Sequence, residues 1–252
     1  MALLEVRDLD MVFGGVHAVQ GLSFEVAPGT VYSVIGPNGA GKTTLFNMVS
    51  GIYKPTRGRI FFDGEDITGK PPHALARRGL SRTFQNLQVC MNLGAIENVM
   101  VGAHLKLSQR LLPAMLHAPW LAKADDACRE EAARLMHFVG VGRYVHAHAS
   151  SLPYGALKRM EIARALAAGP KLLLLDEPAA GLNNTETREI DTLIQKIAAS
   201  GVTVVLVEHD MKLVMGISER ILVLDYGKKL AEGSAAEVRS NPDVIVAYLG
   251  GA

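Results

Sequence analysis

Residues 36–43 read Gly-Pro-Asn-Gly-Ala-Gly-Lys-Thr and match the pattern G-x-x-x-x-G-K-[ST] in full. Glycines in such a loop let successive backbone N–H groups turn inward around phosphate oxygens. Lys42 would reach the β and γ phosphates of a nucleotide, and the Thr43 hydroxyl would bind Mg²⁺. An apolar run at 31–35 precedes the loop, and helical character follows at 45–50. A strand before the loop and a helix after it are the context that phosphate binding requires.

Two carboxylates follow a second apolar run. Residues 172–175 are all leucine, and Asp176 and Glu177 come directly after them. We expect Asp176 to hold Mg²⁺ and Glu177 to polarise an attacking water, a contribution of about 10²–10⁴-fold for a general base. An acidic pair at a solvent-exposed strand end would look the same by itself. Together with the upstream loop, the pair favours hydrolysis of a nucleoside triphosphate.

The secondary structure that must position these residues is predicted to change along the chain, from strands to helices and back to strands. Strand patterns are predicted at 17–27, 31–35, 59–62, 80–84, 172–175 and 202–207, with a hairpin at 221–224 and 228–231. Helical patterns are predicted at 95–107, 122–138, 157–168 and 185–199, and two short helices end the chain. Continuous apolar strands that alternate with helices predict an α/β fold with a parallel sheet covered on both faces.

The length of 252 residues suits one large domain or two small ones. We expect a single domain in which an α/β core, 1–89 and 169–252, is interrupted by a helical region at about 90–168. The formal net charge of +1 argues against a protein held on nucleic acid by phosphate contacts. Only two cysteines occur, without metal-ligand spacing, which fits a reducing cytosol. No apolar run reaches the length of a membrane-spanning helix, and the charged N-terminal segment does not look like a signal peptide.

Taken together, the motifs resemble the ATP-binding cassette (ABC) ATPases over essentially the whole chain. Gln85, in the run Arg-Thr-Phe-Gln-Asn, resembles the family's Q-loop glutamine. Residues 152–156 lie where the signature motif belongs, and 180–183 resemble the D-loop. His209 follows the strand pattern at 202–207 and resembles the switch histidine. Each feature is weak alone, but all of them occur in family order.

The resemblance implies a P-loop core with a mostly parallel sheet, an N-terminal antiparallel β subdomain and an inserted helical subdomain. It also implies ATP and Mg²⁺ as ligands. Gln85 would touch the metal and the transmembrane partner, and His209 would contact the γ-phosphate. Phe13 would stack on adenine with Val19 packing beside it. The nucleotide-binding residues expected from the loop and the signature motif are Asn38, Gly39, Ala40, Gly41, Lys42, Thr43, Thr44, Tyr154 and Gly155.

The signature motif departs from the family's usual Leu-Ser-Gly-Gly-Gln. Pro153 offers neither a hydroxyl nor an N–H, although proline suits the first turn of a helix. Gly155 keeps its place and would still supply a backbone donor, while Ala156 replaces the glutamine. This departure concerns the site that the motif completes on another subunit. It keeps open the alternative of a regulatory cassette with weak hydrolysis.

Several stretches resemble one branch of the family, the longer ATPase of branched-chain amino-acid importers. They are 83–86, Tyr154-Gly155, 161–164, 176–183, 208–217 and 241–250, together with an insert near 104–124. Related importers of urea or short amides, and an ATPase that extracts lipopolysaccharide, remain alternatives. A soluble ABC protein acting on DNA or ribosomes is disfavoured because the chain has one cassette and no heptads.

The resemblance also implies partners and a location. These are transmembrane permease subunits, a second ATPase subunit in a homo- or heterodimer, and indirectly a periplasmic binding protein, with no nucleic acid. The chain would lie peripherally on the cytoplasmic face of a bacterial inner membrane. The apolar segment 105–122 is either a docking surface or packing. The basic residues Lys70, Arg77, Arg78 and Arg82 are expected on a solvated or partner-facing surface, and His146 and His148 in solvated loops.

Overall fold

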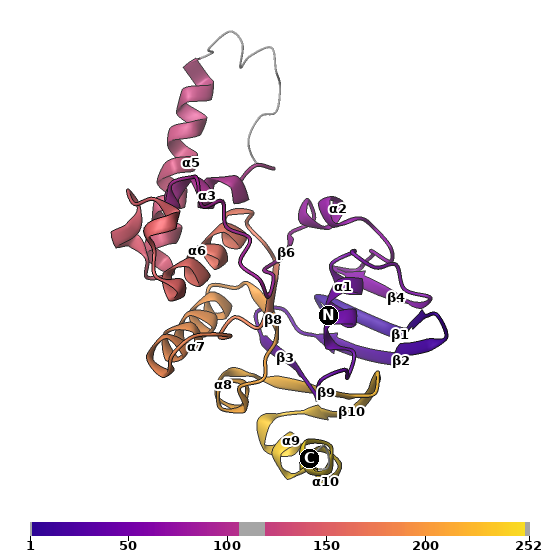
Figure 1. Ribbon diagram of the computed structural model, residues 1–252. Helices are drawn as coiled ribbons and strands as arrows, with labels where there is room; N and C mark the ends of the chain where they lie inside the picture. The colour runs from indigo at the N-terminus through magenta and orange to yellow at the C-terminus, as the bar shows by residue number, and fades with distance from the viewer. Residues whose placement is uncertain (1, 106–118, 250–252) are drawn as a thin grey trace. The chain divides into compact units, whose positions relative to one another are not determined.

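The computed structural model describes residues 2–105 and 119–249 of the chain (Figure 1). These residues separate into two compact units. We call Met1–Arg82 with Lys171–Ala252 the core unit, and Thr83–Pro170 the helical unit. Within the described residues no helix is both long enough and apolar enough to span a membrane. The proposed insert near 104–124 and the segment 105–122 lie mostly outside the described residues.

The core unit holds every strand that the structure describes. The strands are β1 Leu4–Phe13, β2 Val16–Val26, β3 Val31–Ile35, β4 Arg57–Phe62, β5 Glu65–Asp66, β6 Leu80–Arg82, β7 Leu172–Asp176, β8 Thr203–Val207, β9 Arg220–Asp225 and β10 Lys228–Gly233. Its helices are α1 Lys42–Val49, α2 Pro72–Ala76, α7 Asn184–Ala199, α8 Met211–Ile217, α9 Ala235–Ser240 and α10 Pro242–Leu249.

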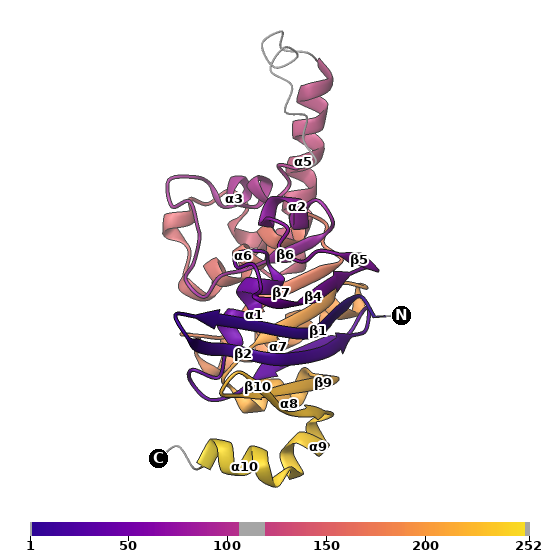
Figure 2. The same ribbon diagram turned by 90° about the vertical axis from the view of Figure 1, so that its right-hand side faces the viewer.

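One sheet has the order β10-β9-β3-β8-β7-β6, in which the neighbours from β9 to β6 are parallel. Only β10 pairs antiparallel, in the predicted hairpin with β9. The other sheet, β2-β1-β4-β5, is antiparallel. Figure 2 shows β1 and β2 running side by side. The α/β fold with a mostly parallel sheet and an N-terminal antiparallel sheet is thus confirmed.

The core unit is layered because side chains alternate along the parallel strands. One face of the six-stranded sheet, including Leu174 and Val205, shares a buried cluster with α1 and the antiparallel sheet. The opposite face, including Ile221 and Val223, packs on α8, α9 and α10. Figure 1 accordingly shows α1 between the two sheets. Helix α1, which follows the phosphate loop, therefore packs on the face of the six-stranded sheet that is covered by the antiparallel sheet.

The helical unit contains α3 Ala95–Gly102, α5 Pro119–Phe138 and α6 Tyr154–Ala167, with 3₁₀ turns at Gly142–Tyr144 and Ala149–Ser151. The three helices pack on one another in all pairings. Their close packing leaves no space for a side chain at Gly102, where a Cβ would lie 1.9 Å from the Arg164 carbonyl oxygen. Helices were predicted to dominate residues 90–168, and they do so in the part of that range that the structure describes.

Candidate nucleotide-binding site

The loop of residues 36–41 joins β3 to α1 in a backbone conformation that demands glycine. Gly36 and Gly41 have φ angles of 151° and 100°. A Cβ at Gly36 would lie 2.1 Å from the Leu224 carbonyl oxygen, and one at Gly41 would lie 2.4 Å from the Ala18 carbonyl oxygen. Both positions therefore exclude a side chain by conformation and by space. The loop is fixed further by a hydrogen bond from Gly227 N to Ala40 O, 3.1 Å long.

Lys42 folds back into this loop. Its Nζ donates to the carbonyl oxygens of Gly36, at 2.7 Å, and Pro37, at 2.9 Å. The residue is only 6% exposed. Burial lowers the pKa of Lys42, and the nearby charge of Glu177 acts in the opposite direction. A desolvated ammonium at the mouth of the loop is a strong partner for phosphate oxygens.

The N-terminus of α1 is open to an anion. Gly41 is its N-cap and supplies no side-chain acceptor, and no acidic side chain lies in the first turn. Thr43 is exposed on that turn, and Asn38 and Gly39 are exposed on the loop. Ala40 is buried, and Thr44 is half-buried. The uncapped N–H groups and the positive end of the helix dipole together favour a phosphate group here.

Sheet order brings the acidic and histidine motifs to the same edge as this loop. Strand β8 lies between β3 and β7, and Val207 pairs with both Val34 and Asp176. Because parallel strands end at one edge, the segments after β3, β7 and β8 meet there. The phosphate loop, Glu177 and His209 therefore all follow neighbouring parallel strands at one edge of the sheet.

Glu177 and His209 make a direct contact. The Nε2 atom of His209 lies 2.7 Å from Glu177 Oε1. This separation is within hydrogen-bond distance for the two side chains. Glu177 has a φ of 49°, in the left-handed region that residues other than glycine seldom adopt. Its N–H donates to Val207 O over 2.9 Å, which fixes the backbone in this conformation.

Asp176 forms a buried ion pair that the sequence analysis missed. Arg82 Nη2 donates to Asp176 Oδ2 over 2.8 Å, and the two side chains are 7% and 8% exposed. Arg82 Nη1 also donates to Asn47 Oδ1 and Ser50 Oγ, at 2.7 and 2.8 Å. The prediction that Arg82 belongs to a solvated or partner-facing basic surface is therefore wrong. The sequence did carry a signal, because Arg82 lies within the predicted strand 80–84, which in the structure ends at Arg82 and pairs parallel with β7.

The aromatic candidate Phe13 ends β1 and is 42% exposed. Tyr53, which the sequence did not single out, meets its ring edge-on with 5.4 Å between the centroids. Val19 is fully buried, and its Cγ2 would lie 3.4 Å from a Cβ at Gly41. Phe13 and Tyr53 thus form an exposed aromatic pair, whereas Val19 lies in the core beside the phosphate loop.

In the helical unit, Gln85 is exposed and its backbone oxygen accepts a 3.1 Å hydrogen bond from Lys158 Nζ. Lys158 is 3% exposed and lies on α6. Glu161, one turn further along α6, accepts from Gln88 N at 3.2 Å. Burial raises the pKa of Glu161. Helix α6 therefore holds the segment around Gln85 through buried charged side chains.

The same helix begins with the altered signature motif. Pro153 is the N-cap of α6, one position before the first helical residue, and no side chain caps this end. Tyr154 is 46% exposed, whereas Gly155 and Ala156 are buried. A backbone end without a side-chain cap still offers N–H groups to an anion, although Pro153 itself has none.

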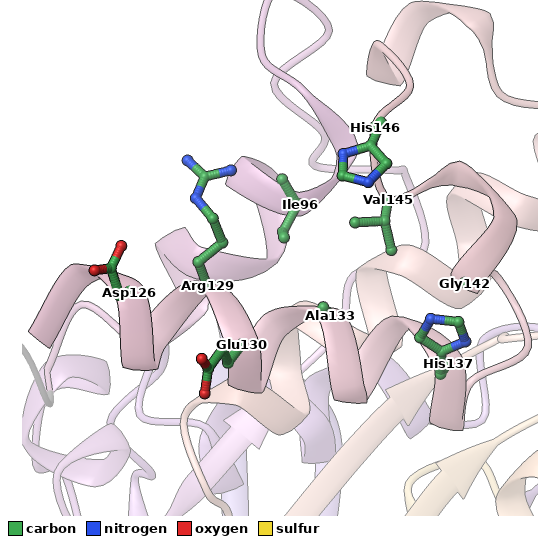
Figure 3. A pocket seen from close by; sticks show the side chains of 9 residues that line it. All are labelled: Ile96, Asp126, Arg129, Glu130, Ala133, His137, Gly142, Val145 and His146. Atoms are coloured by element: carbon green, nitrogen blue, oxygen red, sulfur yellow. The ribbon is translucent and has the colours of Figure 1, made fainter. Parts of the chain in front are cut away.

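A separate groove of about 580 Å³ lies within the helical unit (Figure 3). Arg129 and His137 reach it from α5, Ile96 from α3 and His146 from the segment after the first 3₁₀ turn. His146 and His148 are both exposed. The side chains that the structure describes form no group of three or more histidine, cysteine, aspartate or glutamate residues able to hold a metal ion.

Comparison with known proteins places these features in a family. Residues 19–180 match the model of the ABC transporter family, and residues 228–252 match that of branched-chain amino acid ATP-binding cassette transporters. The chain is 46% identical to the high-affinity branched-chain amino acid transport ATP-binding protein BraF of Pseudomonas aeruginosa. It is 45% identical to LivG of Escherichia coli K12, a protein of the same description. Each match covers 98% of both chains.

Solved structures agree. A crystal structure of an ATP-binding cassette of an ABC transporter in its ADP conformation matches with a TM-score of 0.87 and 31% identity, over 99% of each chain. A nucleotide-free cassette matches with a TM-score of 0.86 and 31% identity. The chain therefore belongs to the ABC transporter family, as one of its nucleotide-binding ATPases.

Proposed function

We propose that this chain is the ATP-hydrolysing subunit of an ABC importer that carries branched-chain amino acids across a bacterial inner membrane. The names of the relatives that match it over nearly their full length support this substrate class. The separate match of residues 228–252 to a branched-chain amino acid cassette model supports the same class. Phosphate binding is independent of the cargo, so the transported molecule is chosen elsewhere in the assembly.

The contact between Glu177 and His209 carries the proposal of hydrolysis. Glu177 would accept a proton from the attacking water, and His209, already 2.7 Å away, would hold that carboxylate and reach the γ-phosphate. Lys42 would exchange its two carbonyl partners for the β and γ phosphate oxygens. Phe13 would stack on adenine, supported at its edge by Tyr53.

The donor set fits Mg²⁺. A threonine hydroxyl at Thr43 and a carboxylate at Asp176 are hard oxygen ligands, and phosphate oxygens would complete the coordination. Arg82 fixes Asp176 in place through a buried hydrogen bond. When bound, Mg²⁺ would neutralise charge on the phosphates. Gln85 would add a ligand from the helical unit.

The partners follow from the same proposal. A second ATPase subunit, identical or different, would cover the nucleotide with its own signature motif, and the backbone around Tyr154 and Gly155 would do the same in return. Permease subunits would dock on the chain and deliver cargo from a periplasmic binding protein. The chain would then be peripheral, on the cytoplasmic face of the membrane.

The test is hydrolysis and transport by the chain assembled with its permease subunits and binding protein in proteoliposomes. We expect ATP-dependent uptake of leucine, isoleucine and valine in preference to urea or acetamide. Glu177→Gln should lower ATP turnover by about 10²–10⁴-fold while ATP binding persists. Glu219→Gln, an exposed carboxylate on the same unit, is the matched control. ATP binding without hydrolysis in the wild-type assembly would instead indicate a regulatory cassette.

A further inference from the structure

Glu208 is a buried carboxylate that none of the predicted roles uses. It follows β8 directly, precedes His209 and is 4% exposed. Its Oε1 accepts a hydrogen bond from Ala179 N at 2.8 Å, and its Oε2 accepts one from His209 N at 3.0 Å. Ala179 lies two residues after Glu177. One side chain thus joins the backbone after β7 to the backbone after β8.

These contacts close a ring. Glu177 and His209 meet through their side chains at 2.7 Å, and their backbone segments meet through Glu208. Hydrogen bonds from N–H groups to a carboxylate are among the stronger ones in proteins. Glu177 is also held in an unfavourable left-handed conformation, with φ at 49°. A strained residue persists only where its surroundings over-determine it.

We propose that Glu208 is a positioning residue for ATP hydrolysis, which sets the distance between Glu177 and His209 by tying the two loops together. The proposal rests on the roles proposed above for those two residues. Both of these hydrogen bonds of Glu208 go to backbone N–H groups, so its effect would pass through backbone placement. A misplacement of about 1 Å in such a site can cost about 10²-fold in rate.

The chemistry of the carboxylate makes the proposal testable by a near-isosteric change. The two N–H groups are bound by different oxygens, and a glutamine has only one oxygen to offer. Glu208→Gln therefore loses one of the two links and turns an NH₂ group toward a backbone N–H. Burial also raises the pKa of Glu208, so the ionised form is costly in the folded chain. We therefore expect Glu208→Gln to impair catalysis by more than its effect on the thermal unfolding midpoint explains.

Two readouts on the full chain test this. In the first, amide hydrogen exchange of the nucleotide-free chain should accelerate by about tenfold or more at Ala179 or His209 in Glu208→Gln, and at both in Glu208→Ala. In the second, Glu208→Gln should lower kcat by about 10- to 100-fold with the ATP affinity unchanged. The permease subunits are added if the chain alone does not hydrolyse ATP. Val205→Ala changes a buried residue of β8, the strand that Glu208 follows, and is the control for general destabilisation.

Unchanged exchange at both amides in Glu208→Ala would overturn the proposal. So would a kcat for Glu208→Gln within twofold of wild type, or equal losses in Val205→Ala. Exchange needs no hydrolysis, so it decides whether Glu208 links the loops even if the chain proves to be a regulatory cassette. Failure of the proposed function and failure of this inference therefore give different results.

Discussion

Arg82 and Asp176 lie side by side at the carboxyl ends of β6 and β7, with Arg82 Nη2 donating to Asp176 Oδ2 over 2.8 Å. Both side chains are more than nine-tenths buried. Arg82 is also the last residue of the core unit before the chain enters the helical unit. The proposed metal ligand is therefore fixed by the residue at the junction between the units.

Removing Arg82 should destabilise the chain strongly. Arg82→Ala leaves the Asp176 carboxylate buried without that cation, and breaking one side of a buried pair costs about 3–5 kcal/mol. Urea unfolding measures the loss. The pair of Arg59 and Asp66 is the control, because it is 3.9 Å long and its side chains are 70% and 42% exposed. Arg59→Ala should cost at most about 1 kcal/mol. Equal costs for the two variants would contradict the prediction.

Gly41→Ala should abolish ATP binding for reasons of space as well as conformation. Gly201 has a similar φ, 93° against 100°, but a Cβ there meets nothing within 4 Å. Gly201→Ala therefore isolates the conformational cost, which is about 1–2 kcal/mol. Gly41→Ala also places its Cβ only 2.4 Å from Ala18 O, a clash that must displace the loop. Calorimetric titration with ATP should find binding in Gly201→Ala and none in Gly41→Ala; equal affinities would show that the overlap is relieved harmlessly.

The site could be predicted from the sequence where motifs follow parallel strands. The phosphate loop follows an apolar run directly, and Glu177 and His209 each follow one after a single acidic residue. Parallel strands bring such segments to one edge. Arg82 carries a weaker signal, because it lies within the predicted strand 80–84 but follows Ser81 rather than an apolar run. In the sequence, Glu208 stands out only as the residue before His209. Its hydrogen-bond partner Ala179 is 29 residues away and becomes its neighbour only in the folded chain.

Some elements escaped prediction for local reasons. Strand β1 was missed because its alternation breaks where Asp8 takes a φ of 46° and the register with β2 shifts between Val6 and Leu9. Helix α1 begins at Lys42, before its first apolar residue, because Gly41 provides the cap. The roles of Gln85, Tyr154 and Gly155 stay predictions, since they depend on a partner subunit.

Tyr53 should contribute to ATP affinity through Phe13. We expect Phe13→Ala to weaken ATP binding by about 1–3 kcal/mol, the range for an aromatic platform under a base. Tyr53→Ala should weaken it by a smaller amount, because it removes only the edge contact at 5.4 Å. Inorganic tripolyphosphate, which has no base, serves as the control ligand. Its affinity should be unchanged in both variants, and a parallel loss would place the aromatic pair in the phosphate site instead.

The last prediction concerns Glu161, whose pKa is raised by burial although Gln88 N and Arg164 favour its charged form. A raised pKa means that the folded state binds more protons than the unfolded state between the ordinary value of about 4.3 and the folded value. The stability linked to this proton is therefore present below the ordinary pKa and is lost as the pH rises through the folded pKa. Glu161→Gln is uncharged at every pH, so it loses no stability as the pH rises through the folded pKa of Glu161.

The free energy of unfolding of Glu161→Gln, relative to wild type, should therefore increase from pH 4 to pH 7 in urea titrations. Glu130→Gln, an exposed carboxylate on α5, should show no such trend. A difference between Glu161→Gln and wild type that stays constant with pH would mean that Glu161 titrates at its ordinary value in the folded chain.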